Sequence, residues 1–186
     1  LPYYLSNYQI TFVDSIFESI SGLTSTGFSI FENIKYLDPT LILWRSSSQW
    51  IGGLYFLIFL IIIFSNNQYN FRLNHLVHTG NMGSFSKSNT KNIIFQIFIV
   101  YSLLTFLIFI ILNIGSVRLF NSLNLSMSII SNGGFLPANT LNQIFLKENH
   151  YILAIVLLIP TLNIFFLFNS YSKQKIISNH QEDIFL

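Results

Sequence analysis

The sequence predicts an all-α membrane protein in which one unit is used twice: a short helix, a glycine-centred loop and a membrane-spanning helix. Three observations carry this prediction: an apolar composition, apolar stretches of membrane-crossing length, and two similar loops. Of the 186 residues, 52% are hydrophobic and only 9% are charged, whereas soluble domains carry about 25% charged residues. The chain lacks the charge that would coat a soluble domain of this size.

The composition also argues against several classes of function. The net charge of +2 is small and the basic residues are scattered, so we expect no nucleic-acid partner. Cysteine is absent, which excludes disulfides and thiolate metal sites. The chain begins with Leu1, and no charged region precedes an apolar run. We therefore expect no signal peptide and a chain that begins inside a longer protein.

Two short apolar segments each lead into a loop of small residues. Residues 12–23 place apolar side chains at three- and four-residue steps, with Asp14 and Glu18 on another face, and residues 117–130 repeat the spacing. Both are too short to cross a bilayer, which needs about 20 apolar residues. We expect half-membrane helices that dip from one face, although periodicity alone leaves buried amphipathic helices open.

Three longer stretches can cross a bilayer: residues 41–64, 93–112 and 151–168, the last interrupted by Pro160. Two crossings separate the two loops, so both loops should open on the same side of the membrane. Lys and Arg are slightly more numerous on the opposite side, which the positive-inside rule makes cytoplasmic. We therefore place the loops on the outer side.

The predicted organisation has four parts. Residues 1–64 form a first unit without a leading span, and residues 93–173 form a complete second unit. A polar cytoplasmic loop, residues 65–92, connects them, and residues 174–186 form a polar cytoplasmic tail.

The two loops have the composition of an ion pathway. Non-helical backbone at membrane depth survives only where protein buries it or where it lines a wet path. A cation that enters a membrane loses water, and rings of backbone carbonyls can replace that water. Glycine permits the left-handed dihedrals that turn carbonyls toward one axis, and helix C-termini add partial negative charge. The predicted ion ligands are Thr24, Ser25, Thr26, Gly27, Ser131, Asn132, Gly133 and Gly134.

Two motifs are specific enough to compare with known families: residues 17–27, FESISGLTSTG, and residues 44–53, WRSSSQWIGG. The first resembles the first pore region of the TrkH/KtrB potassium-uptake subunits, and the second resembles the start of the helix that follows it there. The family's second repeat resembles residues 131–135, SNGGF, together with Asn163 in the last span. The resemblance covers nearly the whole chain.

The resemblance implies a pore of potassium-channel-like architecture with four repeats, each made of helix, pore helix, filter loop and helix. This chain would hold about 1.75 of the four repeats. The implied protein is no enzyme but a multi-pass transporter of the bacterial inner membrane. It needs no cofactor, takes potassium as its substrate, and binds it as a metal ion only through filter carbonyls. The pore-supporting residues would be Glu18, Arg45, Gln49 and Asn163.

The resemblance also implies partners. Surrounding lipid, a second copy in a homodimer, and a cytosolic nucleotide-binding regulatory subunit are expected, with basic residues of the 65–92 loop and Lys173–Lys175 as the docking surface. Any nucleotide would belong to the regulatory subunit, because this chain has no nucleotide motif.

Alternatives to potassium uptake stay open at this point. Phe28 after Gly27 and Asn132 within the second loop depart from the family pattern and leave room for a sodium-permeable variant. A non-conducting remnant or assembly module would keep the fold without the function. A membrane enzyme would have to use Asp14 and Glu18 as paired acids, or His75 with His78. We expect instead that these two acids serve helix N-terminal electrostatics and hydrogen bonds at the pore mouth.

Two features of the first span have structural interpretations. Gly52 and Gly53 are expected to permit close helix packing, since small residues let backbones approach. Arg45 would be costly against lipid. We expect it to snorkel to the outer interface; the alternative is an ion pair with an acid such as Glu32 or Asp38.

Overall fold

The computed structural model describes residues 2–6, 8, 10–65, 90–145 and 150–161, and within them it is helical, without strands. This confirms the all-α prediction for that part of the chain. The elements, in chain order, are α1 (Phe12–Leu23), η1 (Ile34–Tyr36), α2 (Pro39–Ser65), α3 (Thr90–Ile114), α4 (Leu119–Ile130), α5 (Leu141–Ile144), α6 (His150–Leu158) and η4 (Ile159–Thr161).

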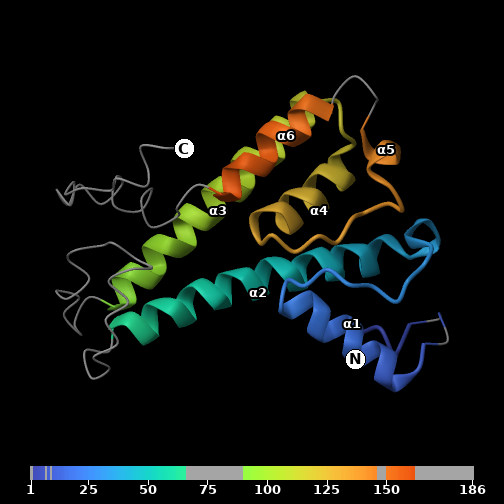
Figure 1. Cartoon of the computed structure of the whole chain (residues 1–186), viewed down its shortest axis with the longest axis horizontal. Coiled ribbons are helices and arrows are strands. Elements are labelled where there is room, and N and C mark those ends of the chain that lie inside the picture. Colours follow the sequence, from blue (N-terminus) through green and yellow to red (C-terminus); the bar gives the residue numbers. More distant parts are fainter. Residues whose placement is uncertain (1, 7, 9, 66–89, 146–149, 162–186) are drawn as a thin grey trace.

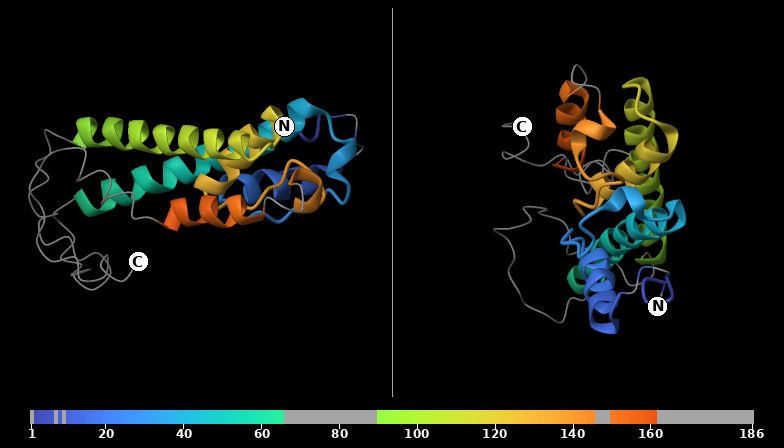
Figure 2. Two further views of the ribbon diagram at one scale, coloured as in Figure 1. Left: turned by 90° about the horizontal axis from the view of Figure 1, so that it is seen from above. Right: turned by 90° about the vertical axis from the view of Figure 1, so that its right-hand side faces the viewer.

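Helix α2 lies at the centre of the arrangement. Helix α1 packs on one side of it and α4 on the other, while α3 covers α4 and also contacts α2 (Figure 1). Both short helices lie toward the same end of α2, as the view from above also makes clear (Figure 2). The backbone thus brings the C-terminal ends of α1 and α4 against a single supporting helix.

Helix α1 has the bounds that the sequence predicts, whereas α4 begins two residues later than expected. The Thr11 side chain accepts a hydrogen bond from the Asp14 amide and so caps α1; such a cap satisfies one of the free amides of a first turn. The predicted start of α4 at residue 117 is wrong, because Ser116 has a φ of 61° after the end of α3. Val117 then follows as a buried residue ahead of the helix.

The burial of α1 is the reverse of that in a soluble helix. Its polar face is turned inward, with Ser15, Glu18 and Ser21 buried, while apolar Phe12 and Ile20 are 58% and 56% exposed. An uncovered apolar face of this kind marks a surface that contacts lipid or further protein. The buried polar face of α1 can therefore form polar contacts with α2.

The close packing expected at Gly52 and Gly53 is confirmed. A Cβ at Gly52 would collide with the backbone of Leu23, the last residue of α1, and one at Gly53 would lie within 2.9 Å of the Ser131 side chain. Neither approach leaves room for a larger side chain. The two glycines thus let α2 touch the ends of both short helices.

The remaining core joins α3, α4 and α6 through apolar residues that include Ile108, Leu112, Leu125, Ile129 and Val156. Among the described residues, one helix segment, Ile94–Ile114, is long and apolar enough to cross a membrane. Helix α6 ends at Leu158, and Pro160 lies in the 3-10 turn η4.

Some predicted features lie outside the described residues. They are most of the 65–92 loop with His75 and His78, the rest of the third span with Asn163, and the tail with Lys173–Lys175.

Candidate functional site

The two loops, residues 24–28 (the first loop) and 131–135 (the second loop), have matching backbones. In the first loop Ser25 has a φ of 52° and Gly27 a φ of 81°; in the second, Asn132 has a φ of 52° and Gly134 a φ of 78°. Glycine adopts this left-handed conformation freely, whereas other residues pay for it. The same alternation therefore recurs at the same two places of both loops.

The helices before the loops match as well. Helices α1 and α4 each have 12 residues. Adding 107 to a residue number in α1 gives the equivalent position in α4, so 12 corresponds to 119 and 23 to 130. Two backbone hydrogen bonds tie each loop to the last turn of its helix. They are Ser25 N to Gly22 O (3.1 Å) and Thr26 N to Ser21 O (3.0 Å), and Asn132 N to Ile129 O (3.0 Å) and Gly133 N to Ser128 O (2.8 Å).

The two loops touch one another. A Cβ at Gly27 would collide with the Gly133 carbonyl oxygen and lie 3.3 Å from the Gly134 Cα. From the other side, a Cβ at Gly134 would lie 3.8 Å from the Gly27 Cα. Two segments more than a hundred residues apart in sequence thus meet at their glycines.

The predicted ligand residues differ in exposure. Thr24, Thr26, Asn132 and Gly134 are exposed, while Gly133 is buried. The Thr24 and Thr26 hydroxyls lie 2.6 Å apart. Because both residues are exposed, the first loop presents two neighbouring hydroxyl oxygens at the surface. The structure therefore gathers all eight predicted residues into one region.

One stripe of α2 supports the second loop. Arg45, Gln49 and Gly53 lie four residues apart, hence on one face of the helix, and they contact the end, the middle and the start of the second loop in that order. The N-terminal half of α2 thus runs along the whole loop.

Gln49 makes the closest of these contacts. Its Nε2 donates to the Gly133 carbonyl at 2.6 Å, and its Oε1 accepts from the Ser128 hydroxyl at 2.9 Å and from the Phe135 amide at 3.2 Å. The side chain is fully buried. A buried carboxamide needs such partners, because an unpaired polar group costs free energy.

Arg45 contradicts the expectation of snorkelling. Its side chain is 1% exposed and its Nε donates to Glu18 Oε1 at 2.9 Å, so Glu18 replaces the acids Glu32 and Asp38 that the sequence suggested. The physical reason is the inverted burial of α1, which turns Glu18 toward the first turns of α2. Burial makes a charge costly unless an opposite charge and hydrogen bonds compensate it.

The pair also holds the chain that leaves the first loop. Glu18 accepts from the Ser29 hydroxyl at 3.0 Å and from the Ile30 amide at 3.0 Å, and Arg45 Nη2 donates to the Ser29 Oγ at 2.8 Å. The guanidinium lies 4.2 Å from the centre of the Phe135 ring, within the range of a cation–π contact. Arg45 therefore touches the exits of both loops.

A phenol completes this cluster. Tyr3 is fully buried, and burial raises the pKa of its hydroxyl to about 12. The phenol stays neutral at physiological pH, so the Glu18–Arg45 pair carries the charges here.

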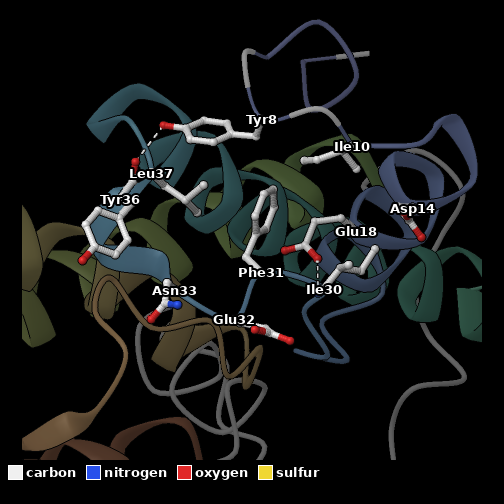
Figure 3. Close-up of a pocket in the computed structure, with 10 residues that line it drawn as sticks. All are labelled: Tyr8, Ile10, Asp14, Glu18, Ile30, Phe31, Glu32, Asn33, Tyr36 and Leu37. Carbon is white, nitrogen blue, oxygen red and sulfur yellow. Dashed lines mark hydrogen bonds between the residues drawn. The ribbon is translucent and has the colours of Figure 1, made fainter.

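Glu18 lines a pocket of about 360 Å³ (Figure 3). Asp14 and Glu32 also line it. Asp14 bonds the Thr11 hydroxyl at 2.6 Å at the start of α1, whereas Glu18 bonds Arg45, so the two acids have separate partners. In the described part of the chain no cluster of three His, Cys, Asp or Glu residues could hold a metal ion.

Asn139 is a contact that sequence reasoning missed. Its Oδ1 accepts from the Ile34 and Lys35 amides at 2.7 and 3.3 Å, and its Nδ2 donates to Asn33 Oδ1 at 3.1 Å. It links the segments that follow the two loops. The only signal in the sequence was its position after the second loop.

The chain matches a family model described as TrkH, cation transport protein, over residues 1–168. An uncharacterized cation transporter of Methanocaldococcus jannaschii is 30% identical over 143 residues, which cover 75% of this chain and 29% of the relative. The Trk system potassium uptake protein TrkG of Escherichia coli is 25% identical over 70% of the chain and 27% of its own length. Trk system potassium uptake protein TrkH of Halomonas elongata is 26% identical over 66% of the chain and 26% of its own length.

The chain thus spans less than a third of the length of these relatives. No solved structure gives a significant match. Because the family model covers residues 1–168 of 186, the chain belongs to the TrkH cation transport protein family.

Proposed function

We propose that the chain forms two adjacent walls of a pathway for the uptake of potassium or a related monovalent cation. The first and second loops are the ion-selecting segments, and α1 and α4 are the half-membrane helices that deliver them. The ligands are backbone oxygens of residues 24–27 and 131–134, which replace the water that the ion loses. Potassium is the substrate of this pathway, and no cofactor takes part.

The observation that carries the proposal is the contact between two loops of matching backbone. Both have left-handed residues at the same two places, and Gly27 packs directly against Gly133 and Gly134. A soluble fold gives no reason to bring two strained, small-residue loops together at their glycines. A repeated ion-binding wall does, because rings of carbonyls need several equivalent segments around one axis.

The uncovered surfaces support a larger assembly. Two walls cannot enclose an ion, and the exposed apolar face of α1 needs lipid or protein against it. We infer that further repeats complete the ring in the full-length transporter, as the greater length of the relatives suggests. This assembly lies in the bacterial inner membrane as a homodimer and works with a cytosolic nucleotide-binding subunit.

The inner supports of the pathway are Glu18, Arg45 and Gln49. They hold the loops from behind and do not bind the ion themselves, because Arg45 and Glu18 neutralise each other and all three are buried. Asn163 is proposed for the same role from the sequence alone.

The test is potassium uptake by the protein expressed at its full encoded length in a host that lacks potassium-uptake systems. Gly27→Val should abolish growth at low potassium, and it should lower uptake by more than it lowers the protein level in the membrane. A β-branched side chain cannot adopt this positive φ without strain, and it would displace the neighbouring carbonyls. Thr40→Val, which introduces the same residue type at an exposed position at the start of α2, is the control and should grow normally. Normal growth of the Gly27→Val strain would refute the proposal.

A further inference from the structure

We propose that Gln49 is the positioning residue of the second loop, so that a helix of the first unit sets the ion selectivity of the second. This inference rests on the proposed function and deepens it. Gln49 belongs to α2, which follows the first loop, yet its carboxamide bonds only to α4 and the second loop: Ser128, Gly133 and Phe135.

The three bonds require both ends of a carboxamide. The NH₂ group fixes the direction of the Gly133 carbonyl, and the oxygen holds the Phe135 amide two residues further on. A carbonyl oxygen has two lone pairs, so this bond orients the Gly133 oxygen without using all of its capacity to accept. The loop segment between the two bonds contains Gly134, whose φ is 78°.

The space around Gly133 is built for this side chain. A Cβ at Gly133 would overlap the Gln49 carboxamide, so the backbone approaches Gln49 more closely than any other residue type allows. On its far side the same carbonyl oxygen lies against Gly27. Gln49 therefore holds the Gly133 carbonyl of the second loop against Gly27 of the first loop and fixes the distance between the two loops.

The first loop has no equivalent support among the described residues. The carbonyl of Thr26, one step of 107 before Gly133, receives no hydrogen bond there, and the contact from Ser25 runs to the backbone of Gln49 at 3.4 Å. Loss of the Gln49 side chain should thus act on the second loop. The groups that contact the Gln49 carboxamide, from Ser128, Gly133 and Phe135, do not titrate. Arg45, one turn earlier on α2, is ion-paired with Glu18 of α1.

The test compares Gln49→Met with Gln49→Glu in the full-length protein, with the ratio of potassium to sodium uptake as the readout. Gln49→Met removes every bond and should lower the ratio about three- to tenfold at all pH values, the range of one or two neutral hydrogen bonds. Position 49 is fully buried, and burial disfavours the charged form of a carboxyl group, so lowering the pH to 5.5 favours the protonated acid in Gln49→Glu. A protonated glutamic acid donates from one oxygen and accepts at the other, so Gln49→Glu at pH 5.5 should come closer to the wild-type ratio than Gln49→Met. If Gln49 only stabilised the fold, its replacement would change the protein level and the melting temperature. Gln49→Glu would then not bring the ratio of potassium to sodium uptake closer to the wild-type value.

Two results would overturn the inference: a wild-type uptake ratio in Gln49→Met, or no advantage of Gln49→Glu over Gln49→Met at pH 5.5. A wild-type protein that takes up neither ion would instead refute the proposed function. In that event cryo-electron microscopy of purified Gln49→Met decides the inference, because the second loop must then lie displaced from Gly27. An unchanged loop in that structure would overturn it.

Discussion

The first and second loops have nearly the same backbone but are held by different chemistry. The first is anchored through a buried ion pair, Glu18 with Arg45, that binds the segment after the loop. The second is anchored through the neutral carboxamide of Gln49 and the Phe135 ring stacked on Arg45. At the step of 107 that relates α1 to α4, Leu125 stands where Glu18 stands in α1.

Because the two loops share a backbone shape but not an anchor, the anchors cannot be what determines that shape. The hydrogen bonds shared by both loops are those to the last turn of the preceding helix, so the helix end and the glycine set the shape. The support from α2 is free to vary in chemistry as long as it satisfies the buried polar groups. Because α2 supplies Arg45 to one anchor and Gln49 to the other, the two loops are coupled through one helix.

The largest expected effect comes from making α1 resemble α4 with Glu18→Leu. Arg45 would be left buried without its opposite charge, which costs about 3–5 kcal/mol. Thermal unfolding of the detergent-purified full-length protein measures the loss. The double variant Glu18→Leu with Arg45→Met should recover most of it, since apolar replacement of a whole buried pair is often close to neutral. A single Glu18→Leu variant as stable as the wild type would contradict the role of the pair.

A smaller effect distinguishes the two loop glycines. Gly27→Ala and Gly134→Ala both force a Cβ into a positive φ, at a cost of about 1 kcal/mol each. Only at Gly27 does the Cβ also collide with the Gly133 carbonyl, which adds about 1–3 kcal/mol of overpacking. Thermal unfolding should therefore give Gly27→Ala a lower melting temperature than Gly134→Ala. The reverse order would mean that the loops do not meet as described.

The smallest effect is expected at the segments beyond the loops. Asn139→Ala removes three hydrogen bonds that link these segments, of which two are exposed, so the net loss should be about 1 kcal/mol. Asn142→Ala, an exposed change in α5, serves as the matched control and should leave the melting temperature unchanged. If both variants unfold alike, Asn139 does not link the segments that follow the loops.

Local features of the chain could be predicted from the sequence, and long-range partners could not. The bounds of α1 follow from the periodicity of residues 12–23, and the matching backbones of the loops follow from their similar motifs. The partner of Arg45 was missed because Glu18 lies 27 residues away. Only the packing of α1 against α2, with its polar face inward, brings the two together.

The role of Gln49 was anticipated only as support for the pore. Its partner Gly133 lies 84 residues away, and no local pattern indicates which loop a glutamine on α2 faces. The start of α4 was missed for a different reason, because Ser116 adopts a positive φ that glycine more commonly takes. Helix propensity and periodicity do not report such a turn.

The central claim is that the first and second loops are two walls of one cation pathway. The most direct test is a cryo-electron microscopy structure of the full-length protein in potassium. The account predicts ion density beside the contact of Gly27 with Gly134, touching backbone oxygens of both loops. Ion density elsewhere in the protein, with Gly27 and Gly134 apart and neither loop touching an ion, would contradict it.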